Sequence, residues 1–199
     1  VQRVLFRSGV GILKNDMMAL LPIPEDYHVV QTDVRKRNKV QVTVDRYQND
    51  DEVTPNNKHL TLVTDRNGNL ISFNASTFKN GGKLPSPDKA LRQAITLFSQ
   101  LDQNYADGLS YMRTEQQERH YEDNGMQVSA PVYWIKFAHR NGSYNWVTIG
   151  PDNQIIEIER ESFWDYFRNR RATEMWNYDN WVLARQGKIP QLAAPDALA

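Results

Sequence analysis

Two short stretches of the chain follow the same pattern, and this internal similarity most constrains the fold. The first is LTLVTDRNGNLISF, residues 60–73, and the second is YNWVTIGPDNQIIEI, residues 144–158. In each, an apolar run leads into a polar turn and a second apolar run follows. When Gly68 is aligned with Asn153, the offset between the two copies is 85 residues. Self-similarity of this kind predicts two copies of one antiparallel sheet unit.

The polar stretch between the two apolar runs of the first copy is Asp65-Arg66-Asn67-Gly68-Asn69. It can be interpreted as a calcium loop, a hairpin turn or one element of the repeat. A calcium loop of the EF-hand type has its glycine at the sixth position and a glutamate at the twelfth. Here Gly68 is fourth and the twelfth residue is Ser76. Asn-Gly between apolar runs is typical of a hairpin, because both residues tolerate positive φ. We therefore predict a turn.

Further elements follow from periodicity. The stretch KVQVTVDRY alternates apolar and polar residues, which predicts a half-buried strand. A helix is expected over residues 87–102, capped by Ser86 or Asp88, because its apolar residues recur at helical spacing. These residues are Leu91, Ala94, Ile95, Phe98 and Leu101. The polar stretch 109–121 is expected to be an edge strand. Weak helical character is predicted for residues 9–24 and a longer, bent helix for residues 161–185.

Together these patterns predict an α+β fold with two similar helix-plus-antiparallel-sheet units. The first unit would occupy residues 1–80 and the second residues 81–160, joined at the Gly-, Pro- and Ser-rich linker 79–88. Residues 161–199 would form a helical, aromatic C-terminal extension with a loose tail.

Composition excludes several classes of function. Lys plus Arg equals Asp plus Glu, 24 of each, so the zero net charge argues against a nucleic-acid-binding protein. The absence of cysteine excludes disulfides and thiolate sites, and it fits an extracytoplasmic protein. No run of 18 apolar residues occurs, so we expect membrane attachment only through an anchor outside this chain.

No catalytic signature stands out, so we predict that the protein is not an enzyme and uses no cofactor or metal. The four histidines are His28, His59, His120 and His139, and none belongs to a paired metal-binding motif. His120 lies near Glu115, Glu118 and Glu122, which leaves open a hydrolase site assembled in three dimensions. The alternative is a charged edge strand that discourages pairing with other chains.

The most unusual feature is the aromatic content of the second half. On PVYWIKF, residues 131–137, the residues Tyr133, Ile135 and Phe137 share one face and Trp134 takes the other. Both faces are therefore expected to be covered, one by the helix 87–102 and the other by the C-terminal aromatic segment.

Aromatic and arginine side chains are also the residues that binding hot spots use. We therefore predict a partner-binding set in the C-terminal segment: Trp164, Phe167, Arg168, Arg171 and Trp176. Ordinary core packing is the alternative interpretation of the same aromatic residues.

The helix DKALRQAITLF followed by PVYWIKF and YNWVTIGPDNQIIEI resembles the PepSY-like family of bacterial extracytoplasmic domains. PVYWIKF, together with HLTLVTDRNGNLISF and the linker and helix that follow it, is also similar to the YycH/YycI-type two-component system regulators of Gram-positive bacteria. The resemblance covers residues 35–160 approximately.

This resemblance implies a non-enzymatic regulator in the cell envelope that binds another protein. The partner would be a membrane sensor histidine kinase or, alternatively, a secreted peptidase held inactive. A cell-wall or small-ligand binding module that uses the aromatic residues is a further alternative.

Overall fold

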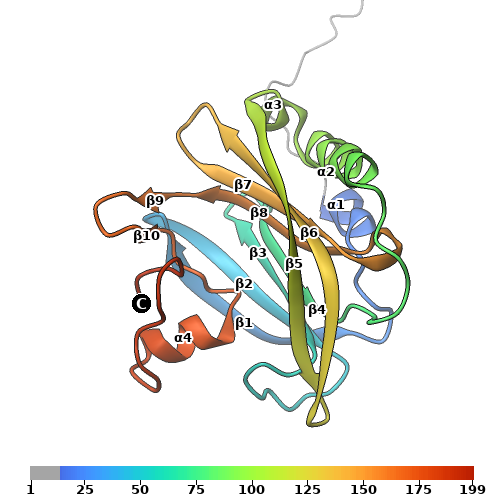
Figure 1. Cartoon of the computed structure of the whole chain (residues 1–199). Helices are drawn as coiled ribbons and strands as arrows, with labels where there is room; N and C mark the ends of the chain where they lie inside the picture. Colours follow the sequence, from blue (N-terminus) through green and yellow to red (C-terminus); the bar gives the residue numbers. More distant parts are fainter. Residues whose placement is uncertain (1–13) are drawn as a thin grey trace, which may run out of the picture.

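The computed structural model describes residues 14–199, and within this range eight strands form one antiparallel sheet (Figure 1). The strand order is β1-β2-β3-β4-β8-β7-β6-β5. The strands are β1 (His28–Arg37), β2 (Val40–Gln48), β3 (His59–Asp65), β4 (Leu70–Ser76), β5 (Leu109–Asp123), β6 (Met126–His139), β7 (Tyr144–Ile149) and β8 (Ile155–Ser162).

The turn between β3 and β4 confirms the hairpin prediction. Gly68 has φ of 80°, in the left-handed region, and its N–H donates to the Asp65 carbonyl at 3.0 Å. The Asp65 carboxylate accepts hydrogen bonds from the backbone N–H groups of Asn67 at 2.8 Å and Asn69 at 2.9 Å. Asp65 therefore uses its side chain to close the turn.

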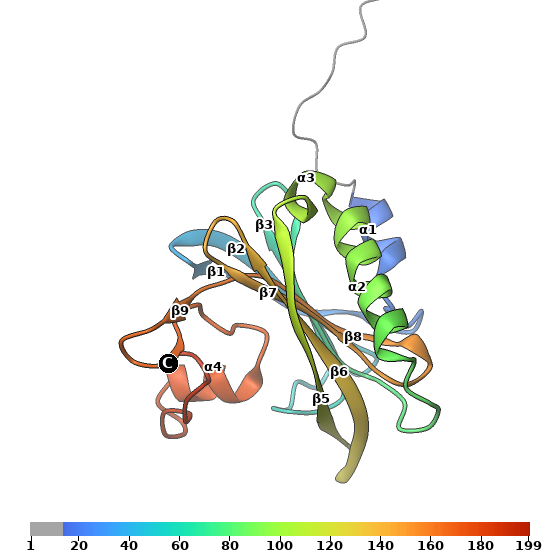
Figure 2. The ribbon, with the colours of Figure 1, turned by 45° about the horizontal axis from the view of Figure 1, so that its top comes forward.

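One face of the sheet is covered by helices α1 (Lys14–Leu20) and α2 (Pro87–Leu101), which lie side by side (Figure 2). Ser86 caps α2 as predicted, since its Oγ accepts a hydrogen bond from the Lys89 N–H at 3.3 Å. The short helix α3 (Gln103–Ala106) follows. The helix expected over residues 9–24 begins outside the described residues, and its described part is α1.

The main core lies between these helices and the sheet. Phe98 of α2 packs edge-on against Phe137 of β6, with ring centroids 5.5 Å apart. Leu91 packs at the border of this core, whereas Ile95 is 48% exposed, so its predicted place in the core is wrong. The apolar stripe of α2 is buried through Ala90, Ala94, Leu97, Phe98 and Leu101.

The expected fold class of two helix-plus-sheet units is wrong. Strands β4 and β8 pair with each other, with Phe73 opposite Ile158, so a single sheet runs through both halves of the chain. The main core contains buried side chains from both halves, including Leu62 and Ile149. The pattern within a strand predicts which face is buried, but it does not predict which distant strand lies beside it.

The opposite face of the sheet is covered by the C-terminal segment, residues 163–199 (Figure 2). This segment contains the two-residue strands β9 (Trp164–Asp165) and β10 (Arg170–Arg171) and the helix α4 (Asp179–Arg185). The long helix predicted over residues 161–185 is therefore wrong, and so is the helical character of the extension. The segment encloses a small core of its own around Met175, Trp181 and Ala197.

Elements from opposite ends of the strand order approach each other at one end of the sheet. At the far end of β5, the Glu122 N–H donates to the Asn56 carbonyl at 3.4 Å, and Asp123 lies 3.3 Å from Lys58 Nζ. β5 is the last strand of the order, as expected for an edge strand, yet its end reaches the loop between β2 and β3. In the part of the chain that the structure describes, no helix has the length and apolar character needed to cross a membrane.

Candidate functional site

The face of the sheet that the C-terminal segment covers carries buried charged side chains. In a strand, alternate residues share a face, so Glu157 and Glu159 of β8 point to the same side. Both carboxylates are fully buried. Burying an ion without a partner is very unfavourable, so the partners of these two groups determine how the segment is held.

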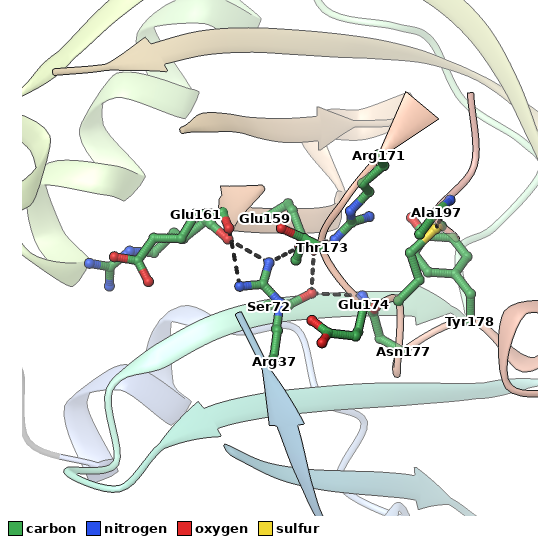
Figure 3. A network of polar contacts seen from close by, with 12 residues as sticks. Arg37, Ser72, Glu159, Glu161, Arg171, Thr173, Glu174, Asn177, Tyr178 and Ala197 are labelled. Carbon is green, nitrogen blue, oxygen red and sulfur yellow. Dashed lines mark hydrogen bonds and ion pairs between the residues drawn. The ribbon is translucent and has the colours of Figure 1, made fainter. Parts of the chain in front are cut away.

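Glu159 is the centre of the first group (Figure 3). Its Oε1 accepts from Arg37 of β1 at 2.5 Å and from Arg171 of β10 at 2.6 Å, and its Oε2 accepts from Ser72 Oγ at 2.6 Å. Asn177 of the C-terminal segment donates in turn to Ser72 Oγ at 2.7 Å. One carboxylate therefore joins the first strand, two central strands and the C-terminal segment.

Burial lowers the pKa of Arg37, and the neighbouring Glu159 charge opposes this effect only in part. The Arg37 guanidinium also donates to the backbone carbonyl of Arg160 at 2.7 Å. These contacts satisfy both ends of the buried pair, as a stable buried ion pair requires.

Glu157 is the centre of the second group. Its carboxylate accepts from Arg119 of β5, from the Tyr178 hydroxyl and, at 3.0 Å, from Thr148 Oγ1. Burial alone would raise the pKa of Glu157, but the Arg119 charge and the hydrogen bonds of Tyr178 outweigh it and hold the pKa below its usual range. Burial next to Glu157 raises the pKa of the Tyr178 hydroxyl, which therefore stays a donor.

The third attachment is at the start of α4. Asp179 Oδ1 accepts from Arg46 at 2.7 Å, and Oδ2 accepts from the Asn56 N–H at 2.6 Å. His59 lies beside them, with Nε2 at 3.9 Å from Asp179 and Nδ1 at 2.6 Å from the Asn57 carbonyl. Burial and the Arg46 charge lower the pKa of His59, so it is neutral and its Nδ1 donates to that carbonyl.

The remaining histidines lie apart from one another. His120 is exposed on β5, His28 is 2.7 Å from Asp51, and His139 stacks on Tyr105 with ring centroids 4.2 Å apart. Among residues 14–199 no three His, Asp or Glu side chains are grouped closely enough to hold a metal ion. The hydrolase site considered around His120 therefore has no assembled ligand cluster in the described residues.

A cavity of about 530 Å³ lies beside the Glu157 group, between the second half of the sheet and the C-terminal segment. Trp134 and Trp146 form its floor, with ring centroids 5.6 Å apart. Lys136 Nζ lies 4.0 Å from the centre of the Tyr144 ring and 5.5 Å from that of Trp134. On the other side, the Arg113 guanidinium lies 5.6 Å from the Trp134 ring.

A hairpin formed by β9 and β10 projects at the rim of this cavity. Asp165 Oδ1 accepts from the backbone N–H groups of Phe167 at 3.0 Å and Arg168 at 2.9 Å, which fixes the turn. The Phe167 side chain is 98% exposed and Tyr166 is 74% exposed. We call residues 166–168 the hairpin tip.

The five predicted partner-binding residues fall into two groups. Trp164, Phe167 and Arg168 belong to the hairpin, where Phe167 and Arg168 are exposed. Arg171 is buried against Glu159, and Trp176 packs on Trp181 with its Nε1 donating to the Lys36 carbonyl at 2.8 Å. Both side chains help to hold the C-terminal segment in place; Arg171 is buried, whereas Trp176 is partly buried.

Sequence reasoning missed the two buried glutamates and the exposed Tyr166. In IIEIERES, residues 155–162, the carboxylates alternate with isoleucines, which is typical of a strand with one face in water. The arginines that pair with these glutamates lie elsewhere in the sequence, so no local signal identifies the glutamates as buried. The prediction that both faces of β6 are covered is confirmed: α2 lies on one side and the C-terminal segment on the other (Figure 2).

Comparisons of the chain with protein-family models, with curated proteins and with solved structures found no match.

Proposed function

We propose that the protein is a non-enzymatic binding protein that recognises another protein through its hairpin tip. The observation that carries this proposal is Phe167, an aromatic side chain 98% exposed at the end of a turn fixed by Asp165. Large aromatic side chains are favourable binding anchors because they bury much area with few rotatable bonds.

The geometry of the tip supports this role. The two hydrogen bonds to Asp165 hold the backbone in one conformation, so little conformational entropy is lost when a partner binds. Arg168 stands next to Phe167 and is 62% exposed, at 3.4 Å from Asp165. An aromatic anchor with a neighbouring arginine is the combination that interface hot spots favour.

The chemistry of the buried carboxylates supports a binding role over catalysis. A general acid or base works best with a pKa near the working pH and with access to the substrate. Glu157 instead has a lowered pKa, and both it and Glu159 are fully buried against arginines. We therefore propose no reaction, cofactor or metal for this protein.

The location and partner class rest on the sequence resemblance. An extracytoplasmic regulator of the YycH/YycI type would bind a membrane sensor histidine kinase, and a PepSY-type inhibitor would bind a secreted peptidase. The exposed tip is compatible with either partner, since both present a folded surface to it.

The test is capture of envelope proteins by immobilised wild-type protein and by the double variant Phe167→Ala, Arg168→Ala. Met126→Ala is the matched control, because Met126 is also a large exposed side chain, 73% exposed, at the tip of the β5–β6 hairpin. We expect the double variant to lose at least about tenfold in affinity for a captured partner, as for loss of a hot spot. Equal capture by the double variant and the control would overturn the proposal.

A further inference from the structure

The cavity behind the hairpin has walls of an unusual composition. Strand pairing places Arg113, Lys136 and Trp146 in one row across β5, β6 and β7. The next row contains Glu115, Trp134 and Thr148. Two cations and two indole rings therefore lie next to one another on this face, and the volume of about 530 Å³ is within the range of small-molecule sites.

Not every charged group at the cavity has an ion-pair partner. Arg113 pairs with Glu115, Arg119 pairs with Glu157, and Arg171 pairs with Glu159. Lys136 also lines the cavity, and within residues 14–199 no carboxylate lies within ion-pair distance of its ammonium group. Asp196 lines the cavity from the C-terminal segment but forms no ion pair with Lys136.

The surroundings of Lys136 favour an added anion. The ammonium group is half-buried between the Tyr144 and Trp134 rings and close to a second cation, Arg113. Burial and the Arg113 charge lower its pKa, and the Glu115 charge opposes this effect only in part. A carboxylate placed beside Lys136 would replace lost water and give the ammonium group the charged partner that it lacks in the described residues.

The aromatic floor determines what else the ligand carries. Trp134 and Trp146 present two indole rings within one cavity, tilted at 51° to each other. Flat, largely apolar groups pack on such rings, and the rings tolerate different ligand skeletons. A ligand with only charge would leave this surface unused.

From this geometry we infer a second binding site, in the cavity between Trp134, Trp146 and Lys136, for an organic carboxylate with a flat apolar group. The carboxylate binds Lys136, and the flat group lies against the two tryptophans. The site borders the hairpin tip through Tyr166, which lines the cavity, but Phe167 and Arg168 do not line it, and the site does not depend on the partner proposed for the tip. The same chemistry is present in a free aromatic acid and in the C-terminal residue of a peptide.

The test uses 3-phenylpropionate and its neutral analogue 3-phenylpropionamide, followed through the indole N–H signals of Trp134 and Trp146 by NMR. We expect the acid to bind about tenfold or more tightly than the amide, which is the effect of one charge-assisted hydrogen bond. N-acetylphenylalanine is the peptide-like arm. Stronger binding of this probe supports a polypeptide C-terminus as the ligand, and stronger binding of 3-phenylpropionate supports a free acid.

The matched variants are Lys136→Met and Lys89→Met, the second lying exposed on α2 across the sheet. Lys136→Met is expected to lose about tenfold in acid binding and to leave amide binding unchanged. Lys136→Arg keeps the charge and retains the preference for the acid. Equal binding of acid and amide, or equal effects of Lys136→Met and Lys89→Met, would overturn the inference. Phe167→Ala tests the hairpin tip separately, because it removes partner capture and leaves acid binding intact.

Discussion

Arg37 and Arg171 donate to the same oxygen of one buried carboxylate, Glu159 Oε1, at 2.5 and 2.6 Å. Arg37 ends the first strand and Arg171 belongs to the C-terminal segment, so a single acceptor joins β1 to the C-terminal segment. Removing the negative charge would leave two buried guanidinium groups facing each other.

We expect Glu159→Gln to lower the free energy of unfolding by about 3–5 kcal/mol, the usual effect of removing one partner of a buried ion pair. Urea unfolding measures the change. Glu118→Gln is the control, because Glu118 is exposed on β5 and its neutralisation is expected to change stability by less than about 0.5 kcal/mol. Similar losses in both variants would show that the Glu159 group does not hold the fold together.

His59 predicts the pH dependence of stability. Burial and the Arg46 charge lower its pKa in the folded state, so the unfolded chain binds a proton more readily. The free energy of unfolding is therefore not reduced by this group above about pH 6.5, the pKa of histidine in the unfolded chain. It falls as the pH drops below that value. Urea midpoints at several pH values between about 7.5 and 5 would measure the slope.

Replacing His59 by Gln removes the titrating group, so we expect a smaller loss of stability over the same pH range. His120→Gln is the matched control, since His120 is exposed on β5. Asp179 titrates at lower pH: burial opposes its charge, but the hydrogen bond and charge of Arg46 and the hydrogen bond from the Asn56 N–H hold its pKa below the usual value. An unchanged slope in His59→Gln would contradict the assignment.

Phe98 and Ile95 were predicted to share the buried face of the helix over residues 87–102, but only Phe98 is in the core. Phe98 is 2% exposed and packs on Phe137, so Phe98→Ala is expected to cost about 3–5 kcal/mol. Ile95 is 48% exposed, so Ile95→Ala is expected to cost less than about 1 kcal/mol. Chemical denaturation measures the free energy of unfolding of both variants. Equal losses of stability would contradict the different packing of the two side chains.

Gly68 lies in the turn between β3 and β4, and Gly81, between β4 and α2, is its control. An added Cβ meets no atom within 4 Å at either position, so steric overlap does not distinguish them. Gly68 has φ of 80°, so Gly68→Ala is expected to cost about 1 kcal/mol through backbone strain. Gly81→Ala is expected to be neutral or slightly stabilising, and thermal unfolding measures both.

The strands and turns were predictable because their signals are local. Alternation identified β2, and Asn67-Gly68 identified the turn. The apolar stripe and Ser86 identified α2 and its start. Each of these patterns depends on residues within one element, where periodicity and capping act.

The sheet order and the site were not predictable in the same way. Arg37 and Glu159 are 122 residues apart in sequence, and nothing local relates them. Arg171 and Trp176 match the composition of a binding surface, yet Arg171 is buried against Glu159 and Trp176 is partly buried against Trp181. A signal for the central strands does exist: Leu70–Phe73 is buried on both faces, which is typical of strands in the middle of a sheet.

The seam between β4 and β8 has a consequence for how the chain reaches this structure. Strands β1 to β4 pair with their neighbours in sequence, and so do β5 to β8, so both sets form from local contacts. The seam joins strands more than 80 residues apart through three residue pairs: Ser72 with Glu159, Phe73 with Ile158 and Asn74 with Glu157. Contacts between distant parts of a chain form slowly because a long loop must close first. We therefore expect seam closure, together with burial of the two glutamates, to set the folding rate.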